Sequence, residues 1–135
     1  MLKANVGRIC FVRMAEGDDV LETIKKSAEQ NGIKAATFTL IGALKNVVMG
    51  CYKGGDYVIT RLDGPMEIAS CIGNIAVDEK DEVIVRAHLV VSNERAGASG
   101  GHLMKGSHVG PTAELMLLEV TGVQLHRTFH DNTKL

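Results

Sequence analysis

The sequence contains few aromatic residues: three phenylalanines, two tyrosines and no tryptophan among 135 residues. Surfaces that bind single-stranded nucleic acid use aromatic side chains to stack against the bases, so a surface of that kind is disfavoured. Excess charge is also missing, because fifteen Lys and Arg against sixteen Asp and Glu leave a formal net charge of −1. DNA-binding proteins gain much of their affinity by neutralising phosphates. To bind DNA, this chain would therefore need a local basic patch, several subunits or a partner.

Paired cysteines and long apolar runs are absent as well. Cys10, Cys51 and Cys71 lie far apart, without a Cys-x-x-Cys pair, and each sits within an apolar run. This spacing predicts buried free thiols in a reducing compartment, with a zinc or redox site as the alternative. No run approaches the roughly 20 apolar residues that span a bilayer, and the first residues lack a signal-peptide hydrophobic region. The sequence therefore predicts a cytoplasmic protein that does not contact membranes.

The composition that remains indicates one globular domain. Hydrophobic residues make up 45% of the chain and charged residues 23%, which is typical of soluble proteins. We expect a single domain over residues 1–135 with its core at about residues 6–129. A helix is predicted over Val20–Asn31, where apolar residues recur at helical spacing. Asp19, followed three residues later by Glu22, resembles a capping box at its start, and Gly32 is the expected stop.

The other apolar segments are separated by turn residues and are typical of β-strands. The turns are predicted at Gly54-Gly55-Asp56, at Asp63-Gly64-Pro65 and at Gly110-Pro111. The expected strands are Val6–Met14, Ala35–Ile41, Val47–Tyr52, Tyr57–Leu62, Met66–Val77, Val83–Ser92, Gly101–Val109, Thr112–Val120 and Gln124–Phe129. One principal helix among strands joined by short turns predicts an α+β fold with a mainly antiparallel sheet of about seven to nine strands.

Several of these strands are apolar on both faces, for example Met66–Val77 and Leu115–Val120. A single helix can cover only one face of a sheet. A closed sheet, or subunits packed sheet to sheet, would cover the other, and we therefore predict a homo-oligomer. Gly73, in the middle of an apolar strand, indicates a bulge or a close backbone contact.

Polar residues that could bind a ligand or a metal ion gather around the strand Val83–Ser92. Arg86 and His88 are two residues apart, so their side chains point to the same face. His102 lies on the candidate neighbouring strand, after a loop that would return it beside His88. Imidazoles on adjacent strands, about 4.5–5.5 Å apart at Cβ, could ligate zinc or another divalent ion. The spacing is equally compatible with structural histidines, and both readings stay open.

Glu67 and Glu114 are single carboxylates within apolar strands. If buried, each must be paired, and is then a candidate partner for Arg86, for a histidine or for a neighbouring subunit. Exposure on the outer face of a strand is the alternative. No Gly-x-Ser-x-Gly nucleophile motif occurs, and the glycine-rich segment 97–101 lacks the Gly-Lys-Ser/Thr of a phosphate-binding loop. These absences favour a binding module over an enzyme.

The order of several short segments resembles the PPC domain, the plant-and-prokaryote conserved domain. The resemblance covers roughly residues 8–120, and no one segment carries it alone. The matching segments are Phe11–Gly32, Ile41-Gly42-Ala43, Gly64-Pro65-Met66-Glu67-Ile68 with Gly73, Ala87-His88-Leu89, Gly100-Gly101-His102-Leu103 and Thr112-Ala113-Glu114-Leu115.

The resemblance implies an α+β fold and a homotrimer formed through the sheets. Stand-alone members are usually described as predicted DNA-binding proteins, but the Arg-Gly-Arg-Pro AT-hook of the plant forms is absent here. Many members carry His-x-His where this chain has Arg86-Ala87-His88, and the third family histidine falls on His102. A guanidinium is no zinc ligand and repels a cation, whereas it attracts an anion or pairs with a carboxylate such as Glu67 or Glu114.

Two hypotheses about function come from these residues and the resemblance. The first is a non-enzymatic homotrimer that acts as a regulatory or DNA-associated module. The second is a protein, with enzymatic activity left open, that binds a small anion or a divalent metal such as zinc. Its site would comprise Arg86, His88 and His102, with Glu67 and Glu114 as further candidates and the two histidines as the metal ligands. An interaction scaffold without any ligand is a third alternative.

Overall fold

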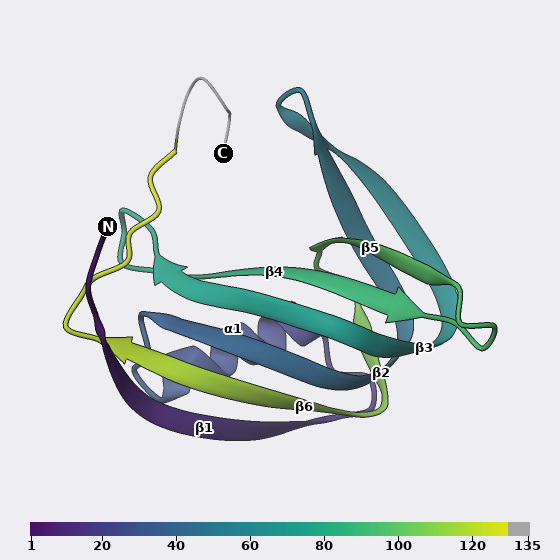
Figure 1. Ribbon diagram of the computed structural model, residues 1–135, viewed down its shortest axis with the longest axis horizontal. Helices are drawn as coiled ribbons and strands as arrows, with labels where there is room; N and C mark the ends of the chain where they lie inside the picture. The colour runs from purple at the N-terminus through teal and green to yellow at the C-terminus, as the bar shows by residue number, and fades with distance from the viewer. Residues whose placement is uncertain (130–135) are drawn as a thin grey trace.

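One antiparallel sheet and one helix make up the computed structural model over residues 1–129, which are the residues the structure describes (Figure 1). The strand order across the sheet is β1-β6-β2-β3-β4-β5, and β5 also pairs with β2. The α+β class predicted from the sequence is therefore confirmed. In chain order the elements are β1 (Asn5–Ala15), α1 (Val20–Gln30), β2 (Ala36–Lys53), β3 (Asp56–Val77), β4 (Val83–Ser92), β5 (Ala98–Leu103) and β6 (His108–Thr121).

The strands of the described chain are fewer and longer than the sequence predicts. Strand β3 unites two expected strands, because the chain continues through the predicted turn at Asp63-Gly64-Pro65 instead of reversing. Strand β2 also unites two expected strands, and its register with β3 is irregular between Thr39 and Asn46. The prediction that Gly110-Pro111 separates two strands is wrong, since both residues lie inside β6. The register of β2 and β6 shifts between Gly42 and Leu44, opposite Ala113 and Val109. A bulge at this place accommodates a proline that cannot donate a ladder hydrogen bond.

The predicted helix is confirmed as α1. Asp19 is its N-cap and accepts a hydrogen bond from the Glu22 backbone at 3.1 Å, while Glu22 itself forms an ion pair with Lys105 instead of closing the capping box. Gly32 follows the helix with φ of +64°, a conformation that favours glycine and stops the helix. With eleven residues, the single helix of the described chain is too short to cross a bilayer.

The last predicted strand, Gln124–Phe129, is reduced to one parallel bridge between Val77 and His126. Two backbone hydrogen bonds flank this bridge, from Val77 to the Leu125 carbonyl and from Arg127 to the Val77 carbonyl. The backbone of this segment is therefore attached to the end of β3.

The core lies between α1 and the inner face of the sheet, and its largest side chains include Phe38, Met14 and Leu115. Gly73 is the close contact expected from the sequence, because a Cβ there would lie 2.2 Å from the Phe38 ring and 2.4 Å from the Arg86 carbonyl oxygen. Cys71 belongs to this core, and burial raises the pKa of its thiol to about 11. Cys51 is exposed and Cys10 half-buried, so the prediction of buried thiols is correct for one cysteine of three.

The other face of the sheet, opposite α1, is open (Figure 1). On it, one row of cross-strand neighbours crosses all the strands of the described chain. The row begins with large apolar side chains and ends with two imidazoles. Its members are Phe11 on β1, Met116 on β6, Thr39 on β2, Ile72 on β3, His88 on β4 and His102 on β5.

Candidate functional site

A pocket of about 500 Å³ lies at the β4–β5 end of this open face. One wall is the hairpin arm, which we define as residues 47–62 of β2 and β3 and which projects beyond the rest of the sheet (Figure 1). The arm reverses at Gly54 and Gly55, both with positive φ, as the Gly-Gly hairpin signal predicts. The other walls are β3, β4 and β5. A volume of this size is in the range of small-molecule sites.

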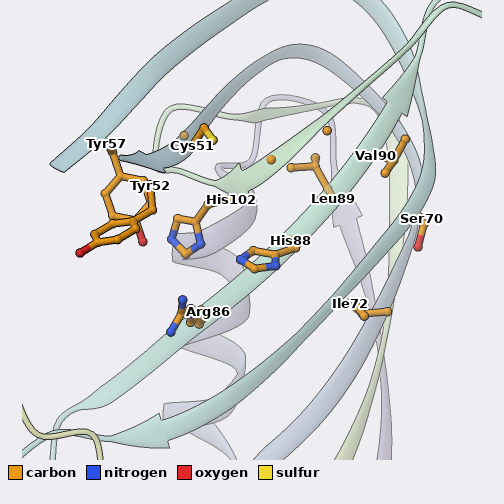
Figure 2. Close-up of a pocket in the computed structure, with 13 residues that line it drawn as sticks. Cys51, Tyr52, Tyr57, Ser70, Ile72, Arg86, His88, Leu89, Val90 and His102 are labelled. Carbon is orange, nitrogen blue, oxygen red and sulfur yellow. The ribbon is translucent and has the colours of Figure 1, made fainter. Parts of the chain in front are cut away.

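Arg86, His88 and His102 line this pocket together (Figure 2). Arg86 and His88 project from the same face of β4, and His102 is the direct cross-strand neighbour of His88. The centroids of the two imidazole rings lie 5.4 Å apart, with the rings edge to face. The juxtaposition that the sequence predicts for these three residues is therefore present in the structure.

The hairpin arm adds aromatic rings to the pocket. The Tyr57 ring lies over His102 with centroids 5.2 Å apart and contacts Tyr52 edge to face at 5.8 Å. Gly50 makes this possible, because a Cβ there would lie only 2.8 Å from Cδ1 of Tyr57. Gly100 and Gly101 line the adjacent wall. The pocket thus combines flat apolar surfaces with nitrogen donors.

The electrostatic environment of the pocket is positive. Burial, followed by the positive charges of His88, Arg86 and Arg127, lowers the pKa of His102 below its ordinary value. None of the described residues that line the pocket is an aspartate or a glutamate. Arg86 forms no ion pair with any described residue. This is an arrangement that attracts an anion.

Glu67 and Glu114 do not contribute to this pocket, and both are exposed. Glu67 is the cross-strand neighbour of Ser92, six residues along β4 from Arg86, which is about 20 Å at the rise of an extended strand. Glu114 lies opposite Arg13 of β1 at the other end of the sheet. Neither carboxylate pairs with Arg86 within the described chain.

The pocket supplies fewer donors from one chain than a protein zinc site uses. Protein zinc sites use three or four protein ligands, whereas His88 and His102 supply two nitrogens. No cluster of three or more His, Cys, Asp or Glu suited to a metal ion occurs among residues 1–129. His108, a third imidazole near these in sequence, is instead bonded through Nδ1 to the Asn46 side chain at 2.9 Å. The Arg86 guanidinium beside the pair adds repulsion toward a cation.

Sequence reasoning missed Tyr52 and Tyr57 as residues of the site. The sequence feature that could have pointed to them is that they are the two tyrosines of the chain and that both flank the Gly-Gly turn. The arm contacts β5 through the pairing of Met49 and Gly50 with Leu103 and His102, and these long-range contacts have no local sequence pattern.

Solved structures of similar fold cover nearly the whole chain. A plant- and prokaryote-conserved (PPC) protein from Pyrococcus horikoshii is 31% identical, with a TM-score of 0.92 over 99% of this chain and 94% of that chain. A metal-containing protein from Archaeoglobus fulgidus is 28% identical, with a TM-score of 0.91 over 100% of this chain and 95% of that one.

A third structure shows the same fold at lower identity. A candidate DNA-binding protein from Ralstonia eutropha JMP134 is 24% identical, with a TM-score of 0.82 over 93% of this chain and 86% of that chain. Comparison with curated proteins finds no match.

The family model of the Plants and Prokaryotes Conserved (PCC) domain matches residues 1–121. That range contains all the strands and the helix of the described chain, together with Arg86, His88 and His102. The resemblance found in the sequence is thereby confirmed. This protein belongs to the family of the Plants and Prokaryotes Conserved domain, also called PPC.

Proposed function

We propose that the protein binds a small organic anion in the pocket between the hairpin arm, β4 and β5. The observation that carries the proposal is a cationic group, Arg86, placed beside two imidazoles without a carboxylate among the lining residues. A half-buried guanidinium without a counter-charge is costly to retain, and an anion that fills the pocket offsets that cost. The tyrosine rings supply surface for the organic part of the ligand.

The test uses two probes that differ in charge, benzenesulfonate and neutral benzenesulfonamide, titrated into the full-length protein by calorimetry. We expect the sulfonate to bind and the sulfonamide to bind at least about tenfold more weakly, since hydrogen bonds to charged groups contribute about 1.5–3 kcal/mol. Arg86→Gln should remove that preference, and Arg95→Gln, which changes an exposed arginine outside the pocket, should retain it. Equal affinity for both probes, or an unchanged preference in Arg86→Gln, would contradict the proposal.

We further propose that the protein is a homotrimer that associates through the open face. The support is the exposure of large apolar side chains there: Phe11 is 78% exposed, Ile41 61% and Ile72 61%. Apolar patches of this kind mark association surfaces. The number three comes from the family resemblance. Light scattering should give about three times the chain mass of 14.5 kDa, and a stable monomer would exclude self-association.

DNA association as a regulatory module is the second candidate. Its support is the name of the Ralstonia neighbour together with the cationic pocket. The net charge of −1 counts against it. Fluorescence anisotropy with duplex DNA over a salt series separates the candidates. Affinity that falls steeply with salt would favour DNA, and no binding at low salt would leave the small-anion function.

A further inference from the structure

A second arginine, from a different part of the chain, contacts the cross-strand neighbour of Arg86. Arg127 lies in the C-terminal segment, and its backbone N–H donates to the Val77 carbonyl at 2.8 Å. Its side chain turns back over β3, where Nη2 donates to Oδ1 of Asn74. The segment is therefore fixed at both its backbone and its side chain.

The contact with Asn74 places Arg127 beside Arg86. Asn74 and Arg86 are direct cross-strand neighbours on the open face, and such neighbours have Cβ atoms about 4.5–5.5 Å apart. A smaller pocket of about 270 Å³ lies at this place and shares Arg86, His88 and Ile72 with the larger one. The two pockets are therefore neighbours, and Arg86 lines both.

Neither guanidinium has a carboxylate partner among residues 1–129. Burial and the nearby charge of Arg86 both lower the pKa of Arg127, which nevertheless stays charged near neutral pH as arginines do. The Nε of Arg127 is buried without a hydrogen-bond partner in the described chain. Two like charges held together at some cost indicate that the missing charge comes from a ligand.

We propose that the pocket selects a doubly charged ligand, the phosphate monoester of an aromatic group, and that Arg127 is a second ligand-binding residue beside Arg86. This inference rests on the small-anion function proposed above. Two guanidiniums match the near-double charge of a phosphate monoester at neutral pH. The aromatic part would lie against Tyr57 and His102, whose rings form the flat wall of the larger pocket.

The experiment compares phenyl phosphate with benzenesulfonate, which has the same ring and a tetrahedral head but one charge. Calorimetry at pH 7.5 on the full-length protein should show phenyl phosphate binding at least about tenfold more tightly. Arg127→Gln should reduce that preference to less than about threefold by weakening phenyl phosphate alone, and Arg127→Lys, which keeps the charge, should retain part of it. Arg95→Gln is the control for loss of a surface arginine.

Further probes distinguish the sources of a phosphate group. Inorganic phosphate, which lacks the ring, should bind more weakly than phenyl phosphate, and duplex DNA, whose phosphodiesters carry one charge each, should not displace it. Equal affinity for phenyl phosphate and benzenesulfonate, or an unchanged preference in Arg127→Gln, would overturn this proposal. If Arg86→Gln still weakens both probes in that case, the small-anion function stands. If the wild type binds neither probe, both proposals fall.

Discussion

Two regions of the sheet hold arginines in opposite ways. At the β1–β6 end, Arg8 donates to both carboxylate oxygens of Glu119, at 2.7 and 2.9 Å, and to the Asn31 carbonyl at 2.9 Å. The carboxylate also accepts a hydrogen bond from the Arg8 backbone N–H at 3.1 Å, and these bonds lower the pKa of Glu119 to about 2. At the β4–β5 end, Arg86 and Arg127 have no such partner in the described chain.

We interpret this difference as one between a structural role for Arg8 and the proposed binding role of Arg86 and Arg127. The Arg8 guanidinium is neutralised by Glu119 and holds two strands and the end of α1 together. It therefore has little unpaired charge and few free donors for a ligand. The guanidiniums of Arg86 and Arg127 have donors but no carboxylate partner in the described chain, which supports the proposed anion binding. The row that begins at Phe11 connects the two ends, and its member Ile72 also lines the pocket, so the proposed subunit interface and the proposed ligand site adjoin on one face.

The largest expected effect concerns the apolar end of that row. Phe11→Glu places a charge in the proposed subunit interface and should convert the oligomer to monomers, because a buried unpaired charge is not tolerated there. Light scattering gives the mass. Arg86→Gln should keep the oligomer. If Phe11→Glu assembles like the wild type, the open face is not the interface.

The same substitution, arginine to glutamine, compares the two kinds of arginine. Arg86→Gln should weaken benzenesulfonate binding about 10- to 100-fold while the melting temperature without ligand stays the same or rises. Arg8→Gln should leave the affinity unchanged and lower the melting temperature, because it removes the partner of Glu119. Calorimetry and thermal unfolding are measured on each variant. Reversed effects would show that the roles assigned to the two regions are wrong.

Two glycines offer a smaller contrast between the regions. Gly73→Ala should lower the free energy of unfolding by about 1–3 kcal/mol, because the new Cβ meets the buried Phe38 ring and the Arg86 backbone. At Gly7 a Cβ would instead lie 2.9 Å from side-chain atoms of Glu119 and Thr121, so Gly7→Ala should lower the free energy of unfolding by less than Gly73→Ala does. Urea unfolding at one fixed protein concentration measures both. Equal decreases in the free energy of unfolding would show that the contacts around Gly73 relax as easily as those around Gly7.

The smallest expected effect is in the pH dependence of stability. The folded pKa of His102 is lowered from 6.5, so the folded state binds fewer protons than the unfolded state, and stability falls as the pH drops below 6.5. Glu119, lowered from 4.5 to about 2, contributes stability above pH 4.5 that is lost only as the pH falls from there toward 2. Melting temperatures from pH 8 to pH 3 should therefore show two separate declines. His102→Gln should remove the upper decline and Glu119→Gln the lower one.

Local patterns were sufficient for much of the fold. Helix α1 was predictable because capping and periodicity are properties of neighbouring residues, and β4 has the predicted bounds, Val83–Ser92. The predicted break at Gly110-Pro111 failed, because a bulge in the register of two distant strands absorbs the proline. The spacing of two residues between Arg86 and His88 on one strand also correctly predicted that both side chains lie on the same face.

By itself, the sequence determined most of the residues that form strands and helix and which of them face one side, and the family resemblance implied that Arg86 replaces a histidine of other members. These are consequences of backbone periodicity and of side-chain chemistry, both of which are local. Only the tertiary structure brought Tyr57 into the larger pocket, placed Arg127 against Asn74 of the smaller one, and left Glu67 and Glu114 outside both. The arrangement depends on register between strands far apart in the chain, and register is set by the packing of the whole sheet.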